Sequence, residues 1–101
     1  MTVKIRNYNF DGPFRSTDPI EDKSGIYAVL HYKDGKCYLL DVGESSKMKT
    51  EIEEKTQKVW EKKSEGQIDF SVYYTPKLKA DDRKEIESNI RSTYLPLSLK
   101  S

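Results

Sequence analysis

Two apolar runs joined by a tight-turn signal are the feature that most limits how this chain can fold. Residues 25–32 (GIYAVLHY) and 36–43 (KCYLLDVG) both have the composition of strands, and Asp34-Gly35 lies between them. An Asp-Gly pair favours a two-residue hairpin turn, because both central residues of that turn adopt a positive φ. The sequence therefore predicts an antiparallel hairpin.

Alternation along this hairpin sorts its side chains onto two faces, because successive residues of a strand point to opposite sides. Tyr27 and Val29 are expected to share one face of the first strand. On the second strand, Leu39 is expected to share a face with Asp41. Apolar side chains occur on both faces, so both are expected to be partly buried.

Apolar residues at helical spacing predict a helix over residues 47–63, after Gly43 ends the hairpin. Ser45 or Ser46 is expected to cap it, because a short hydroxyl side chain accepts bonds from the first free backbone N–H groups. Acidic and basic residues four positions apart support the helix on its exposed side. Its apolar positions are Met48, Ile52, Val59 and Trp60.

The rest of the pattern predicts one more strand and one more helix. Residues 68–75 (IDFSVYYT) alternate between apolar and polar side chains. Asp82 and Glu85 resemble a capping box at the start of a second helix, and Pro96 is expected to mark its end. The predicted order from residue 25 onward is β-β-α-β-α.

The first 24 residues are expected to form an N-terminal arm that packs on a domain made of residues 25–101. Gly12-Pro13 is expected to interrupt any regular element there, since glycine and proline are the strongest breakers of local structure. A length of 101 residues suits one domain with one modest core.

Composition narrows the classes of function. Net charge is +1, from 18 basic and 17 acidic residues, so composition alone does not favour nucleic-acid binding. Cys37 is the one cysteine and His31 the one histidine, which rules out an internal disulfide and a zinc site built from these two residues. The chain shows no apolar signal core and no stretch of membrane-spanning length, so a cytoplasmic protein without membrane contact is expected.

The spacing of four segments resembles the GIY-YIG nuclease domain, which occurs in homing endonucleases and in the incision subunit of bacterial excision repair. Residues 25–27 read GIY, residues 41–43 read DVG, and Glu87 lies nine residues before Pro96. A small stand-alone branch of that superfamily often has an aspartate as the first residue of the second triplet. The resemblance, over residues 25–99, implies an α/β sandwich with a small three-stranded central sheet and flanking helices.

The resemblance also implies a chemistry, the hydrolysis of DNA phosphodiesters with one divalent cation such as Mg²⁺. Tyr27 matches the first motif tyrosine, which lies near the attacking water, and Glu87 matches the glutamate that holds the metal. Mg²⁺ accepts a carboxylate together with waters and substrate oxygens, and it polarises the phosphoryl oxygen. The family also uses a helix arginine that stabilises the developing negative charge.

Three positions depart from the family pattern. Asp41 stands at the second motif tyrosine, and Glu51 stands at the arginine, eight residues after Gly43. A carboxylate repels the phosphate oxygens that an arginine would bind bidentately. Lys55 stands where the related branch often has a histidine. Lys47 or Lys49 is a candidate for the missing cation, although an ammonium does not copy the guanidinium fork.

Each of these residues also has a plain structural interpretation. Tyr27 can be an aromatic that packs in a strand. Asp41 can satisfy turn amides at the end of a strand. Glu51 can be a solvated helix residue paired with Lys55, and Glu87 a solvated helix glutamate.

Three functional hypotheses remain open. The first is a degenerate, non-catalytic GIY-YIG domain that binds nucleic acid or protein. The second is an active but divergent Mg²⁺-dependent endonuclease. The third is a small protein-interaction factor with no nucleic-acid role. A homodimer is compatible with all three, because exposed aromatic residues and a thin core favour association.

Overall fold

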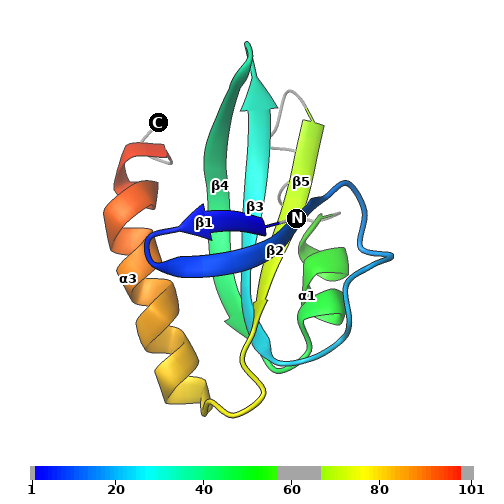
Figure 1. The fold of residues 1–101 in the computed structure, drawn as a ribbon, viewed down its shortest axis with the longest axis vertical. Coiled ribbons are helices and arrows are strands. Elements are labelled where there is room, and N and C mark those ends of the chain that lie inside the picture. The colour runs from blue at the N-terminus through cyan, green and yellow to red at the C-terminus, as the bar shows by residue number, and fades with distance from the viewer. Residues whose placement is uncertain (1, 57–66, 99–101) are drawn as a thin grey trace.

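The computed structural model describes residues 2–56 and 67–98, which contain a five-stranded antiparallel sheet and two helices (Figure 1). The strand order is β1-β2-β5-β3-β4, so β1 and β4 are the outermost strands. The elements in chain order are β1 (Thr2–Ile5), β2 (Tyr8–Phe14), β3 (Gly25–Lys33), β4 (Lys36–Ser45), α1 (Met48–Lys55), β5 (Gln67–Tyr74) and α3 (Ala80–Ser98).

The prediction of a small three-stranded sheet is wrong, because the N-terminal segment adds two strands. β2 pairs with β5, and β1 pairs with β2. Gly12-Pro13 does not end β2; Gly12 adopts a φ of 121°, and the pairing with β5 shifts register between Asp11 and Phe14. A proline is tolerated inside a sheet at such an irregularity. Figure 1 shows β1 and β2 running across β3 and β5, so the sheet curls into a half-barrel.

The predicted hairpin is confirmed. β3 and β4 pair from Gly25 opposite Ser45 to Lys33 opposite Lys36. Asp34-Gly35 forms the turn, with φ values of 54° and 77°. These positive φ values match the type of two-residue turn that the Asp-Gly pair favours.

A bulge in β4 overturns one detail of the alternation. Val29 lies opposite Asp41, but Leu30 lies opposite Leu39, so Leu40 is the extra residue. An extra residue reverses the faces of everything beyond it. The prediction that Leu39 and Asp41 share a face is therefore wrong, and Asp41 lies on the face of Val29.

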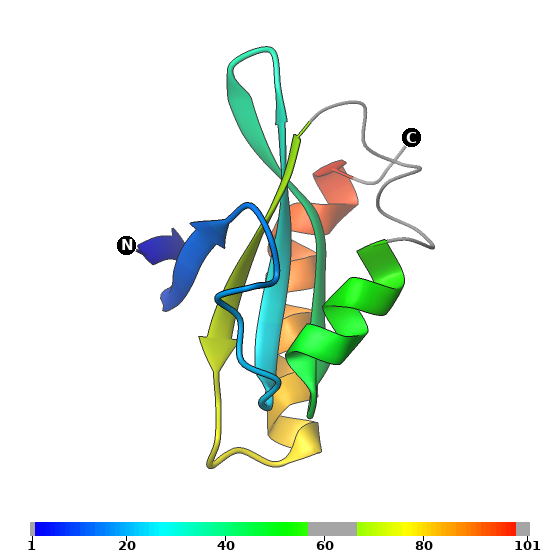
Figure 2. The ribbon, with the colours of Figure 1, turned by 90° about the vertical axis from the view of Figure 1, so that its right-hand side faces the viewer.

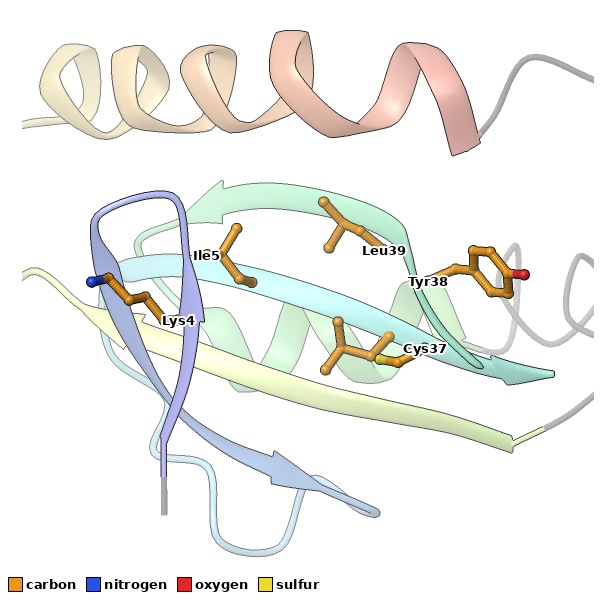
Figure 3. Close-up of a pocket in the computed structure, with 6 residues that line it drawn as sticks. Lys4, Ile5, Cys37, Tyr38 and Leu39 are labelled. Atoms are coloured by element: carbon orange, nitrogen blue, oxygen red, sulfur yellow. The ribbon is translucent and has the colours of Figure 1, made fainter. Parts of the chain in front are cut away.

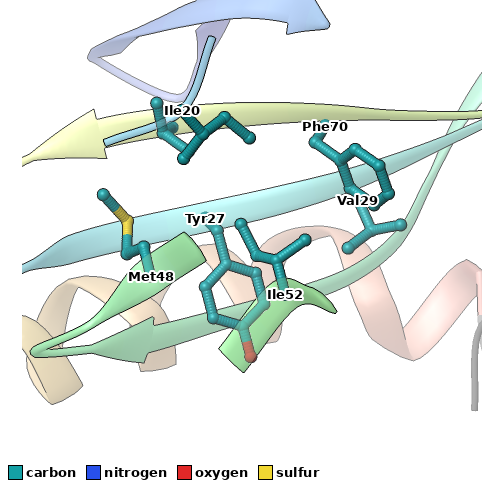
Figure 4. Close-up of a cluster of buried hydrophobic side chains, with 7 residues drawn as sticks. Ile20, Tyr27, Val29, Met48, Ile52 and Phe70 are labelled. Atoms are coloured by element: carbon teal, nitrogen blue, oxygen red, sulfur yellow. The ribbon is translucent and has the colours of Figure 1, made fainter. Parts of the chain in front are cut away.

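Two apolar clusters form, one on each face of the sheet, and each includes side chains from a helix. Figure 2 and Figure 3 show α1 and α3 on opposite sides of β3 and β4. The predicted shared face of Tyr27 and Val29 is confirmed, since both lie in the cluster under α1 (Figure 4). That cluster contains Ile20, Tyr27, Val29, Met48, Ile52, Phe70 and Val72. The cluster under α3 contains Ile5, Phe10, Ile26, Ala28, Val42 and Ile90.

The prediction that Ser45 or Ser46 caps α1 is wrong, because Lys47 is at the N-cap position and its side chain makes no capping hydrogen bond. Ser45 Oγ accepts the backbone N–H of Lys47 at 3.0 Å, as a turn before the helix. Asp22, from the loop before β3, accepts the backbone N–H of Thr50 at 2.9 Å and its hydroxyl at 2.8 Å. A carboxylate at this end is favourable because helix N–H groups there lack partners.

The helix boundaries differ from the predicted ones. α3 begins at Ala80, two residues before Asp82, and it continues past Pro96 to Ser98. The second half of the predicted helix over residues 47–63, with Val59 and Trp60, lies outside the described residues. Among the helices that the structure describes, none has the length and apolar character needed to cross a membrane.

Candidate functional site

Tyr27 lies on β3, between Val72 of β5 and Gly43 of β4. Its side chain belongs to the apolar cluster under α1, and the residue is only 1% exposed. The ring crosses the backbone of Gly43, where a Cβ atom would overlap the Tyr27 hydroxyl. Glycine at 43 therefore lets the hydroxyl reach the outer strand of the sheet.

Two side chains of α1 bind the Tyr27 hydroxyl. The hydroxyl donates to Glu51 Oε2 at 2.6 Å and accepts from Lys55 Nζ at 3.0 Å. Glu51 and Lys55 also form an ion pair with 3.5 Å between Nζ and Oε2. Residues four apart lie on the same side of a helix, which explains why both reach one hydroxyl.

The environment of Tyr27 raises the pKa of its phenol well above the ordinary value. Burial is the main cause, followed by the hydrogen bond to Glu51 and by the negative charges of Glu51, Asp41 and Glu87. Each of these effects disfavours the phenolate. Tyr27 is therefore a neutral hydrogen-bond donor at physiological pH.

Arg91 joins the carboxylates of two different elements. Its Nη2 lies 3.2 Å from Asp41 Oδ1 on β4, and its Nε lies 3.6 Å from Glu87 Oε2 on α3. The same Nη2 donates to the carbonyl oxygen of Val42. Asp41 Oδ1 also accepts the backbone N–H of Val42 at 2.8 Å, so its strand-end position satisfies a backbone amide as well.

The structure brings the five predicted site residues, which come from β3, β4, α1 and α3, into the surroundings of the Tyr27 hydroxyl. Hydrogen bonds connect Tyr27 to the two α1 residues, and the two remaining carboxylates lie close enough to affect its pKa. The five are Tyr27, Asp41, Glu51, Lys55 and Glu87.

Arg91 is the residue that the sequence analysis missed. Its position four residues after Glu87 places both on one side of α3, a spacing that favours an ion pair. That signal was available in the sequence. The contact with Asp41 was not, because it depends on how α3 packs on β4.

The two other lysines considered as substitutes for the family arginine lie elsewhere. The pKa of Asp22 is lowered, chiefly by hydrogen bonds from Thr50 and in part by the charge of Lys47, so Lys47 lies near Asp22. Lys49 is two residues before Glu51, which turns it about 200° around the helix. Lys55 is instead the lysine that bonds to the Tyr27 hydroxyl, and Arg91 pairs with Asp41 and Glu87.

The end of the β3–β4 hairpin holds a separate feature. A hollow of about 150 Å³ lies between β1 and the hairpin, and none of the five predicted site residues lines it (Figure 3). Cys37 is exposed at its edge. Burial, followed by a hydrogen bond with Cys37, raises the pKa of Tyr32 to about 12. The hollow is lined by Lys4, Ile5, Leu30, Cys37, Tyr38 and Leu39.

The donor set does not fit a resident Mg²⁺. Across residues 2–56 and 67–98, no group of three or more His, Cys, Asp or Glu side chains is arranged to hold a metal ion. Asp41 and Glu87 both face the guanidinium of Arg91. A hard cation needs the negative charge of its carboxylate ligands, and here an internal positive charge already compensates it.

Comparisons with known proteins add no information on function, so the proposed function rests on this geometry. The sequence matches no protein-family model, and it matches neither a curated protein nor a solved structure. Membership of the GIY-YIG superfamily stays a prediction from the sequence motifs.

Proposed function

We propose that this chain is a catalytically inactive relative of the GIY-YIG nucleases, which acts by binding and does not cleave. One observation carries the proposal: the groups at the catalytic positions are bonded to one another. The Tyr27 hydroxyl donates a hydrogen bond to Glu51, and Arg91 pairs with Glu87. A substrate phosphate would have to break these contacts before it reached any of these groups.

The charge around Tyr27 also opposes cleavage. Phosphoryl transfer depends on positive charge placed at the developing oxyanions. Among the described residues at this site, three carboxylates (Asp41, Glu51 and Glu87) stand against two cations (Lys55 and Arg91). The sum is −1, which repels a phosphodiester.

The phenol of Tyr27 is poorly suited to help an attacking water. Its raised pKa keeps it protonated, and its proton is directed at Glu51 Oε2, 2.6 Å away. A general base works best with a pKa near the operating pH. Tyr27 therefore has the properties of a structural hydrogen-bond donor.

Nucleic acid is the partner that a second region of the surface favours. Backbone hydrogen bonds join three loops where β3 begins and β4 and β5 end. The N–H of Met48 donates to the carbonyl of Lys23, and the N–H of Thr75 donates to the carbonyl of Ser24, both at 3.0 Å. Exposed lysines on these loops form what we call the lysine end. They are Lys23, Lys47, Lys77 and Lys79.

The lysine end is expected to bind phosphate groups only weakly. Its Lys23 ammonium pairs with Glu21 at 3.4 Å, and Asp22 lies on the same loop. Lysines bind phosphate as flexible point charges, so this surface suits weak, sequence-independent and salt-sensitive binding. That property matches the neutral composition better than a tight nuclease–substrate contact does.

A nicking assay tests the absence of cleavage. Supercoiled plasmid is incubated with the wild type and Mg²⁺ or Mn²⁺, and no nicked product is expected. Glu87→Gln serves as the site variant. Metal-dependent nicking by the wild type that disappears in E87Q would establish the alternative hypothesis, an active divergent endonuclease.

A binding assay tests the partner. Fluorescence anisotropy with labelled DNA and RNA at low salt is expected to show binding that weakens steeply as salt rises. The double variant Lys47→Glu/Lys77→Glu is expected to bind roughly tenfold more weakly. Lys36→Glu, at the opposite end of the hairpin, is the matched charge control and should change binding little.

The second candidate function is a protein-interaction factor without a nucleic-acid role. The net charge of +1 favours it, since a protein partner requires no basic surplus. If neither DNA nor RNA binds at low salt, the nucleic-acid proposal is wrong and this candidate takes its place.

A further inference from the structure

We infer that Arg91 serves as the built-in cation of this site: its guanidinium stands where a divalent ion would bind, and removal of its charge converts Asp41, Glu87 and the Val42 carbonyl into a divalent-cation site. The comparison with a metal position rests on the proposed function. The contacts that carry the inference stand independently of it.

Arg91 contacts three oxygen atoms that come from two elements. These are Oδ1 of Asp41 and the carbonyl oxygen of Val42, both on β4, and Oε2 of Glu87 on α3. One planar guanidinium reaches all three, so the three oxygens surround a common volume. The Arg91 side chain fills that volume with positive charge.

The three oxygens are of the kinds that hard divalent cations prefer. Mg²⁺, Mn²⁺ and Ca²⁺ bind carboxylates and backbone carbonyls together with water. Asp41 and Glu87 are 22% and 26% exposed at their side chains, which leaves room for waters to complete the coordination. The positive charge of Arg91 opposes the binding of a cation by this set.

Removal of that charge leaves two carboxylates near each other. Like charges this close destabilise each other's ionised form, and the strain is relieved either by protonation or by a bound cation. At neutral pH a divalent cation stabilises the two ionised carboxylates more than protonation does, because it attracts both of them at once. An arginine-to-methionine change keeps the apolar stem and removes the charge.

The experiment is a Mn²⁺ titration followed by calorimetry and by paramagnetic broadening in NMR spectra. The wild type is expected to show no site-specific binding. Arg91→Met is expected to bind Mn²⁺ at least roughly tenfold more tightly than the nonspecific binding of the wild type, with broadening centred on the amides of Val42 and Glu87. Mg²⁺ should compete for the same site.

Three matched variants separate charge from structure. Arg91→Lys keeps the positive charge and should bind no more Mn²⁺ than the wild type. Arg6→Met loses the same charge at another α3 contact, where Arg6 Nη1 donates to Thr93 Oγ1 at 2.8 Å, and should also match the wild type. R91M/E87Q should lose the acquired binding.

Two results would overturn the inference. One is a folded R91M, checked by circular dichroism, that binds Mn²⁺ no more tightly than R6M. The other needs only the wild type: Mn²⁺ binding that E87Q abolishes would show that Arg91 does not exclude the metal. Plasmid nicking reports separately on the proposed function, so failure of one proposal is distinguishable from failure of the other.

Discussion

Two arginines of α3 bind carboxylates of β4, and they differ in surroundings. Arg83 is 9% exposed at its side chain, its Nε lies 3.0 Å from Glu44 Oε2, and it also donates to the carbonyl of Leu78. Arg91 is 43% exposed and reaches two carboxylates beside Tyr27. The same chemistry therefore holds the helix on the sheet at one position and compensates negative charge beside Tyr27 at the other.

The largest effect is expected at the buried pair. Arg83→Met leaves Glu44 with little access to water and without its partner, which should lower the free energy of unfolding by about 3 kcal/mol. Urea denaturation measures this. In R83M/E44Q no unpaired charge remains, so part of the loss should return. An R83M protein as stable as the wild type would contradict the structural role.

The contact between Tyr27 and Gly43 gives the next largest effect. Gly43→Ala places a methyl group against the Tyr27 hydroxyl, which should cost about 2 kcal/mol because the ring cannot move freely in a packed cluster. The cost should shrink in a Tyr27→Leu background, where the hydroxyl, Cζ and Cε2 that the added methyl group would overlap are all absent. An equal cost in both backgrounds, measured by a double-mutant cycle, would show that the ring does not cross Gly43.

Alkaline pH tests the environment of Tyr27. Its folded-state pKa is raised, so the folded state keeps a proton that the unfolded state loses above about pH 10. Stability from this group is complete below pH 10 and falls above it, by at most about 1.4 kcal/mol per pH unit.

Tyr27→Phe should therefore flatten the alkaline loss of stability, measured by urea denaturation at successive pH values. Tyr32→Phe is the matched comparison. The pKa of Tyr32 is raised to about 12, so its variant should change the slope only between pH 10 and 12. An alkaline slope that Y27F leaves unchanged would place the Tyr27 hydroxyl in water.

The smallest effect on stability is expected at Arg91. Its ion pairs are partly exposed and screened by salt, so Arg91→Met should lower the free energy of unfolding by about 1 kcal/mol. The loss should shrink at high salt. A cost as large as that of R83M would erase the distinction between the two arginines.

The sequence predicted the elements whose signals are local. Asp34-Gly35 identified the hairpin, and strict alternation identified β5. The N-terminal strands were missed because Gly12-Pro13 is typical of a break, and only pairing with β5 allows β2 to continue through it. The bulge at Leu40 was missed for the same reason, since register depends on the neighbouring strand.

Sequence motifs placed several candidate residues near one another, but they did not reveal Arg91 or the bonds between these residues. Motif spacing predicted that Tyr27, Asp41 and Glu87 lie close together, and both carboxylates are near enough to raise the pKa of Tyr27. Spacing does not reveal that Glu51 accepts a hydrogen bond from the Tyr27 hydroxyl, or that Arg91 reaches across to Asp41. Those contacts depend on how α1 and α3 pack against β4, and the proposal of an inactive site rests on them.

The most direct test of the proposed inactivity is plasmid nicking by the wild type over a long incubation, with protein in excess and either Mg²⁺ or Mn²⁺ present. Glu51→Arg and Glu54→Arg accompany it, the second being the same swap at an exposed position of α1. The proposal predicts no cleavage by the wild type or by E54R. Cleavage gained in E51R alone would show that the site is preserved and lacks only the positive charge at this position. Metal-dependent nicking by the wild type that E87Q abolishes would contradict the proposal.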